Sequence, residues 1–206
     1  MSEEYNYDLV IVGGGPAGSS AAFAAAKNGI KVALIEKENT IAETVRTSGV
    51  TWIESIKEFG IPDDCYNPIK NFSFASPNNQ VTISDVVATA AVLDVRKTYR
   101  WLANEAKKIG VDIFVKTNIN EVIKNDENDI VGVSGIGVNG KTSFHAKVII
   151  DATGFTSTIS KAMGFVTQWK RFGVGAEYEA KVENVDSETW WLMVGQEYTP
   201  AGYAWI

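Results

Sequence analysis

Short apolar runs and one alanine-rich stretch open this chain, and their order predicts an α/β fold. Residues 8–12 are almost wholly apolar, which is typical of a short strand buried on both faces of a parallel sheet. Residues 16–28 predict a helix, and a second apolar strand ends at Glu36. The order strand, helix, strand is that of a βαβ unit, so both strands are expected in one parallel sheet.

Later segments add two longer helices and a set of short strands. Residues 52–59 and 94–109 have helical periodicity, and a shorter helix is expected over 157–163. Three strands separated by turns predict a meander that leads back to the parallel sheet. The later strands expected, in chain order, are 72–75, 80–84, 111–115, 119–124, 130–136, 142–146, 147–151, 173–182 and 190–194.

Composition and charge exclude several classes of protein. The 206 residues are 45% hydrophobic and 21% charged, which is ordinary for a globular protein with a sizeable core. The net charge of −6 argues against a nucleic-acid partner. No apolar run approaches the ~20 residues of a membrane span, and there is no signal peptide, so a cytoplasmic protein is expected. The single Cys65 and the single His145 suggest no metal site, and His145 is expected at the surface of a strand.

The turn after the first strand carries the pattern of a dinucleotide-binding site. Gly13, Gly15 and Gly18 supply a tight turn, a close backbone approach to a pyrophosphate, and close helix–strand packing. The helix that begins at Pro16 points its N-terminal N–H groups at that pyrophosphate. Glu36 ends the second strand, where a carboxylate accepts hydrogen bonds from a ribose diol and repels a 2′-phosphate. The pattern favours FAD or NAD over NADP and does not choose between the first two.

Several separate blocks of the sequence resemble one family of flavoproteins. The blocks are the glycine turn with Glu36-Lys37, and residues 45–50, 96–111, 116–120, 148–164 and 202–206. Their layout is similar to the superfamily of glutathione reductase and p-hydroxybenzoate hydroxylase, and within it to the geranylgeranyl reductase family. The resemblance implies a Rossmann-like FAD-binding domain with a parallel sheet and a β-meander crossover, plus the start of an antiparallel substrate-domain sheet.

The resemblance also implies which residues hold FAD. Thr47 and Ser48 lie along the flavin where the family often has Cys-Gly, so no thiol role is expected there. Arg46 either pairs with the pyrophosphate or is a solvated loop arginine, and Arg96 either reaches the pyrophosphate side or pairs with Asp94. The expected cofactor-binding residues are Gly13, Gly15, Pro16, Ala17, Gly18, Glu36, Lys37, Arg46, Thr47, Ser48, Arg96, Ile119 (through its backbone, at the adenine), Ala152 and Gly154.

Two aromatic residues near the last position are the expected substrate contacts. In the geranylgeranyl reductases a Tyr-x-Trp-x-Phe-Pro motif lines the pocket for the isoprenoid chain, and Tyr203 and Trp205 match its first part. Two aromatics at a spacing of two also fit one face of a strand. No residue is marked as an acid or base by its context, so no catalytic residue is assigned.

The resemblance also suggests how the chain is divided into domains. Residues 1–70 and 94–165 are expected in the FAD-binding domain, 71–93 in strands on the substrate side, and 166–206 at the start of the substrate-binding domain. The family's later Gly-Asp segment does not occur in this sequence, so we expect a chain truncated at its C-terminus. Expressed alone, such a chain is expected to bind FAD weakly and to aggregate through exposed apolar edges.

The function implied by the resemblance is that of an FAD-dependent oxidoreductase that saturates C=C bonds of prenyl chains or prenyl lipids. Electrons would come from NADPH or a small electron carrier, and a lipid substrate implies peripheral contact with a membrane. Two alternatives stay open: an FAD-dependent monooxygenase or halogenase of the same superfamily, and a non-catalytic FAD-binding fragment.

Overall fold

A computed structural model gives the fold, and it describes residues 3–165 and 173–206. Internal contacts divide the chain into two compact units: unit 1 is Met1–Val45 with Tyr99–Gly173, and unit 2 is Arg46–Thr98 with Val174–Ile206. Residues 46–70 and 94–98, expected in the FAD-binding domain, pack in unit 2. The expected boundary at residue 166 begins a stretch, 166–172, that lies outside the described residues.

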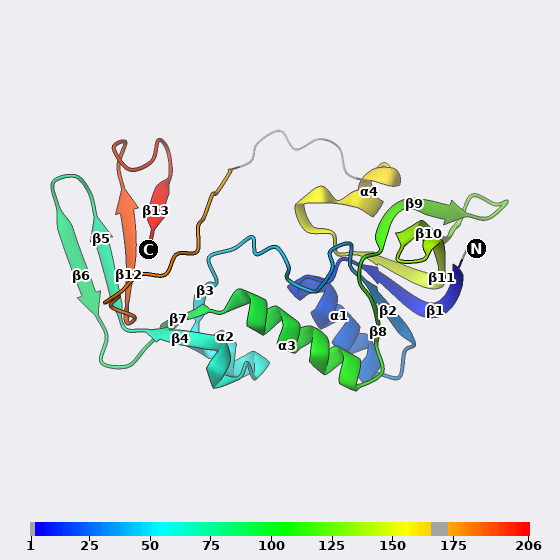
Figure 1. The fold of residues 1–206 in the computed structure, drawn as a ribbon, viewed down its shortest axis with the longest axis horizontal. Coiled ribbons are helices and arrows are strands. Elements are labelled where there is room, and N and C mark those ends of the chain that lie inside the picture. Colours follow the sequence, from blue (N-terminus) through cyan, green and yellow to red (C-terminus); the bar gives the residue numbers. More distant parts are fainter. Residues whose placement is uncertain (1–2, 166–172) are drawn as a thin grey trace. The chain divides into compact units, whose positions relative to one another are not determined.

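Unit 1 is built on a six-stranded sheet in the order β8-β2-β1-β11-β10-β9 (Figure 1). Strand β1 runs parallel to both β2 and β11, while β9, β10 and β11 pair antiparallel. The expected α/β fold with a parallel sheet and a meander is therefore confirmed. The elements are β1 (Glu3–Val12), α1 (Pro16–Lys27), β2 (Val32–Ile35), residues 99–108 of α3 (Val95–Lys108), β8 (Asp112–Phe114), β9 (Asn118–Lys124), β10 (Ile130–Gly137), β11 (Gly140–Asp151), η2 (Gly154–Thr156) and α4 (Thr158–Ala162).

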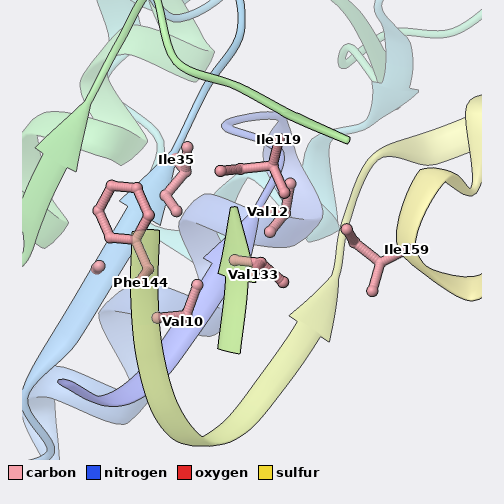
Figure 2. Close-up of a cluster of buried hydrophobic side chains, with 8 residues drawn as sticks. Val10, Val12, Ile35, Ile119, Val133, Phe144 and Ile159 are labelled. Atoms are coloured by element: carbon pink, nitrogen blue, oxygen red, sulfur yellow. The ribbon is translucent and has the colours of Figure 1, made fainter. Parts of the chain in front are cut away.

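Strand β1 is apolar at successive positions because both of its faces are covered. Leu9 and Ile11 belong to a buried cluster that also contains residues of α1, α3 and β2. Val10 and Val12 belong to a second cluster, with Ile35 and with side chains from the meander and α4. Figure 2 shows this second cluster, in which side chains distant in sequence point toward one another. Its buried members are Val10, Val12, Ala33, Ile35, Ile119, Val133, Phe144 and Ile159.

The prediction of two separate strands over 142–146 and 147–151 is wrong, because β11 is continuous. Its residues 142–146 and 148–151 pair with β1 in one unbroken parallel register. Only residues 140–145 also pair with β10 on the other side. The pairing between β10 and β11 therefore ends close to the break that was expected near Lys147, while β11 itself continues as an extended strand.

Unit 2 contains two smaller sheets, β13-β12-β5-β6 and β3-β7-β4 (Figure 1). The strands expected over 72–75, 80–84 and 190–194 are confirmed as β5, β6 and β12. The sheet β3-β7-β4 was not expected, because its strands are three or four residues long and show no clear alternation. The elements are β3 (Val50–Trp52), α2 (Ile53–Phe59), η1 (Asp63–Cys65), β4 (Tyr66–Ile69), β5 (Asn71–Ala75), β6 (Gln80–Ser84), β7 (Ala90–Leu93), residues 95–98 of α3, β12 (Thr189–Val194) and β13 (Tyr203–Trp205).

The strand predicted over 173–182 is wrong. These residues form neither helix nor strand, and every one of them is exposed. An alternating pattern favours a strand only where a neighbouring strand accepts its hydrogen bonds and a core covers one face. Here neither condition is met within the described part of the chain.

Candidate functional site

Two glycines, Gly13 in the turn between β1 and α1 and Gly18 in the first turns of α1, are required by the protein's own packing. Gly13 has a φ of +112°, and a Cβ there would lie 2.2 Å from the carbonyl oxygen of Ala152. A Cβ on Gly18 would lie 1.9 Å from the carbonyl oxygen of Gly13. Real Cβ atoms do not approach backbone that closely, so a larger residue at Gly13 would push the turn away from Ala152, and one at Gly18 would push α1 away from the turn.

Gly15 differs from its neighbours because it faces open space. Its φ of −70° and ψ of −174° suit any residue, and a Cβ there would meet no atom within 4 Å. Gly15 is the N-cap of α1 and offers no side-chain cap, and Pro16 follows it. The first N–H groups of a helix have no intrahelical partner, so this end presents donors and a positive dipole end toward the space beside Gly15. Ala17, in the same first turn, is exposed.

The Glu36 carboxylate is held at the edge of this turn by two backbone donors. Its Oε2 accepts a hydrogen bond from the N–H of Gly14 at 2.8 Å, and its Oε1 accepts one from the N–H of Glu38 at 2.9 Å. Each carboxylate oxygen has a second lone pair, so both keep the capacity to accept from a ligand. Lys37 follows and is exposed.

The loop after β11 packs directly against the glycine turn. The N–H of Ala152 donates to the carbonyl oxygen of Val12 at 2.8 Å, which extends the β1–β11 pairing to the turn. Gly154 follows at a φ of +65°, is exposed, and has open space where a Cβ would stand. The structure therefore brings Ala152 and Gly154 to the same end of the sheet as the glycine turn.

Asp151 organises this loop, although sequence reasoning assigned it no role. Its Oδ1 accepts from the N–H and the hydroxyl of Thr153 at 3.1 and 2.6 Å, and its Oδ2 accepts from the N–H and the hydroxyl of Ser160, both at 2.7 Å. Burial alone would raise the pKa of Asp151, but these hydrogen bonds hold it below its ordinary value of 3.8. An aspartate at a strand end, followed by threonine and serine, was the available signal for such a capping network.

Ile119 lies in the core of unit 1 and presents no side chain to a ligand. It is 3% exposed and packs in the cluster with Ile35 (Figure 2). Thr117, two residues earlier, donates its N–H to the carbonyl oxygen of Glu36 at 2.9 Å. The backbone around Ile119 therefore runs close to the end of β2, as a contact through the backbone would require.

The remaining expected cofactor contacts belong to unit 2. Arg46 and Thr47 are exposed and Ser48 is half-buried, in the irregular segment before β3. Arg96 is half-buried in the first turn of α3, and its Nη1 lies 3.7 Å from Oε2 of Glu179. The alternative partner considered for Arg96, Asp94, instead accepts a hydrogen bond from the N–H of Lys97 at 2.9 Å and caps the helix.

One face of the sheet β13-β12-β5-β6 is apolar across all four strands. Directly paired residues share a face, and the register places Phe72 opposite both Trp190 and Ile83. Trp205 lies opposite Leu192, so it shares that face, and the rings of Tyr203 and Trp205 are 5.9 Å apart. The aromatic pair therefore lies on one face of a strand, as part of a broad apolar surface. That surface consists of Phe72, Phe74, Val81, Ile83, Trp190, Leu192, Val194, Tyr203 and Trp205.

The described residues also show where possible metal ligands, the single histidine and the single cysteine lie. Within them, no three His, Cys, Asp or Glu side chains stand together as metal ligands. His145 lies in β11 as expected but is half-buried rather than exposed. Cys65 is a buried free thiol, and burial raises its pKa. None of the helices in the described ranges combines the length and apolar character that a membrane crossing requires.

Comparison with known proteins places this geometry in context. A family model described as FAD dependent oxidoreductase matches residues 8–181. The chain is 37% identical to a digeranylgeranylglycerophospholipid reductase of Methanocaldococcus jannaschii, over 97% of this chain and 52% of that protein. It thus spans about half the length of the curated relatives it matches first.

Solved structures agree with this resemblance. A geranylgeranyl bacteriochlorophyll reductase-like protein from Thermoplasma acidophilum is 27% identical, with a TM-score of 0.79 over 98% of this chain and 53% of that one. The flavin-dependent brominase Bmp2 is 25% identical, with a TM-score of 0.62 over 78% of this chain and 41% of that one. The expected resemblance to geranylgeranyl reductases is therefore confirmed.

Proposed function

The chain belongs to the FAD dependent oxidoreductase family, with FAD as its cofactor, and from this premise we propose that the intact protein reduces C=C bonds in the prenyl chains of lipids. The observation that carries the proposal is the 37% identity to a digeranylgeranylglycerophospholipid reductase over 97% of this chain. The other solved neighbour described above, a brominase, is less similar and shares less of the chain.

The residues of unit 1 fit the adenosine and pyrophosphate part of FAD. The open space at Gly15, beside the first turn of α1, suits a pyrophosphate that accepts hydrogen bonds from the helix N-terminus. The Glu36 carboxylate, already oriented by two backbone donors, would accept hydrogen bonds from the ribose diol. We assign the remaining contacts to Pro16, Ala17 and Gly18 in the turn, the backbone of Ile119 at the adenine, and Lys37, Ala152 and Gly154 alongside.

The residues assigned in unit 2 are expected at the pyrophosphate, at the flavin and at the substrate. Arg46 and Arg96 would supply positive charge to the pyrophosphate, and Thr47 and Ser48 would line the flavin. When bound, reduced FAD supplies hydride to one carbon of an isolated C=C bond. Tyr203 and Trp205, on the apolar face of the sheet, would bury the prenyl chain and exclude water from it.

Reductant and location belong to the same proposal. We expect NADPH or a small electron carrier to supply the electrons. The Rossmann-like nucleotide site would be occupied by FAD and not by NADPH. A prenylated lipid resides in a membrane, so the intact protein would work at a membrane surface by peripheral contact.

Anaerobic reduction of the intact holoprotein, followed by addition of a geranylgeranyl lipid, tests the proposed activity. The expected result is reoxidation of the flavin, seen in its absorption spectrum, together with a lipid product that is heavier by two hydrogens for each bond reduced. A saturated lipid of the same head group is the matched control and should leave the flavin reduced.

Two other results would replace this proposal. NADPH oxidation in air that is stimulated by an aromatic substrate, with a hydroxylated or halogenated product, would indicate the monooxygenase or halogenase alternative. A holoprotein whose flavin reacts with no lipid and no aromatic substrate would indicate a non-catalytic FAD-binding protein.

A further inference from the structure

The segment that follows Glu36 folds back over the glycine turn. A Cβ placed on Gly14 would lie 2.3 Å from Cδ1 of Ile41, so the isoleucine side chain rests directly on this glycine. Ile41 is 7% exposed, although it lies in a loop without regular structure. The N–H of the same Gly14 donates to Oε2 of Glu36 at 2.8 Å. The position of Ile41 and the orientation of the Glu36 carboxylate are therefore linked through one residue.

One side chain from the distant helix α3 is bonded to this segment at two points. Arg100, in α3, donates from Nε to the carbonyl oxygen of Ile41 at 3.1 Å. It also donates from Nη2 to the hydroxyl oxygen of Thr40 at 3.1 Å. A guanidinium group can reach two neighbouring acceptors at once in a fixed planar geometry, which a lysine ammonium cannot reproduce. All of these residues lie in unit 1.

We propose that Arg100 is a positioning residue for recognition of the cofactor's ribose. It acts through Ile41 and Gly14 to keep the Glu36 carboxylate aimed at the 2′- and 3′-hydroxyls. The inference rests on the proposed function, since it assumes that Glu36 accepts hydrogen bonds from the ribose of FAD. The proposal adds Arg100 to the residues that recognise the ribose, and Arg100 acts on the site through the loop that follows Glu36.

The matched variants follow from these contacts. Arg100→Met keeps an unbranched apolar stem and removes every donor, while Arg100→Lys keeps the charge and one donor group. Thr40→Val removes one acceptor of the pair with little change in shape, at an exposed position. Lys107→Met is the control, because Lys107 is an exposed cation in the last turn of the same helix.

The test compares binding of ADP and 2′-deoxy-ADP to the intact protein after removal of FAD. These probes share the pyrophosphate and adenine and differ only in the 2′-hydroxyl. One hydrogen bond to a charged acceptor corresponds to roughly tenfold in affinity, so the wild type and Lys107→Met should favour ADP by about that factor. In Arg100→Met the preference should fall to about twofold, with Arg100→Lys and Thr40→Val between these values. Denaturation midpoints measured alongside report whether each variant is folded.

Each remaining outcome contradicts either the positioning role of Arg100 or the proposed contact between Glu36 and the ribose. An Arg100→Met variant that is folded and keeps the full preference for ADP, even with weaker binding of both probes, overturns the positioning role. If Arg100→Met does not fold, an unchanged preference in Thr40→Val overturns it instead. A wild-type protein that binds neither probe, or binds both equally, contradicts the proposed ribose contact of Glu36 itself.

Discussion

The glycines of residues 13–18 allow a sharp prediction, because Gly13, Gly14 and Gly18 are confined by the protein and Gly15 is not. A Cβ on Gly18 would lie 1.9 Å from the carbonyl oxygen of Gly13 and 3.2 Å from Cβ of Ala152. Alanine gains about 1 kcal/mol over glycine inside a helix, but overpacking against backbone typically costs about 1–3 kcal/mol and occasionally more. Since the nearest atom is backbone, we place Gly18→Ala at the upper end, with a net loss of about 2 kcal/mol or more.

Gly15→Ala should have the opposite effect, with little change in stability and weaker binding of FAD. No atom lies within 4 Å of the new methyl group, and the backbone angles suit alanine. The loss of a good N-cap and the lower entropy of the unfolded chain nearly cancel, so stability should change by less than about 1 kcal/mol. The methyl group would instead stand between the helix N-terminus and the pyrophosphate, and loss of one charge-assisted hydrogen bond weakens binding roughly tenfold or more.

Thermal denaturation without FAD and titration of FAD fluorescence separate the two effects. For a domain of this size, a loss of about 2 kcal/mol lowers Tm by roughly 4–8 °C. Gly18→Ala should show this decrease and Gly15→Ala should not, whereas Gly15→Ala should show weaker FAD binding at unchanged Tm. Equal Tm values for the two variants, or wild-type FAD affinity in Gly15→Ala, would refute the reasoning.

Three further predictions concern the loop after β11, the core and the substrate side. Asp151→Asn should lower stability by about 1–2 kcal/mol at neutral pH in urea denaturation. Because the pKa of Asp151 is lower in the folded state, the difference in unfolding free energy between wild type and variant should have its full size above pH 3.8 and should shrink as the pH falls below that value. A difference that does not depend on pH would contradict the hydrogen-bond network of Asp151. Phe144→Ala should lower the free energy of unfolding by about 3–5 kcal/mol, since this side chain is fully buried. Lys141→Ala, at an exposed position of the same strand, should change it by less than about 0.5 kcal/mol. Equal effects of the two substitutions would show that Phe144 is not in the core. Trp205→Ala should raise KM for a prenyl lipid roughly tenfold and leave the flavin spectrum unchanged, and an unchanged KM would remove Trp205 from the substrate side.

Much of the fold of unit 1 follows from local sequence. A buried strand, a glycine turn and an alanine-rich helix are determined by short-range sequence pattern and by backbone angles that only glycine adopts freely. The predicted helix over 16–28 and the strand ending at Glu36 therefore agree with α1 and β2 to within a residue or two. The pattern at Gly13, Gly15 and Gly18 likewise points to a dinucleotide before any contact is known.

Other expectations failed because they depend on partners distant in the chain. The continuity of β11 comes from its pairing with β1, more than a hundred residues earlier, which an apolar pattern alone does not reveal. The segment 173–182 alternates like a strand, yet has no neighbouring strand to pair with among the described residues. Periodicity records the side-chain pattern, whereas a strand also needs hydrogen bonds from another segment.

The sequence by itself determined the glycine turn and the type of the elements on either side of it, because these are set by residues within one or two turns of each other. Only the tertiary structure decided how the candidate site is supported: Gly14 orients Glu36, Ile41 covers Gly14, Arg100 holds Ile41, and Asp151 ties β11 to α4. These contacts join segments that meet through packing and strand register. Their residue types are ordinary along the chain, so their roles become visible only where the fold brings them together.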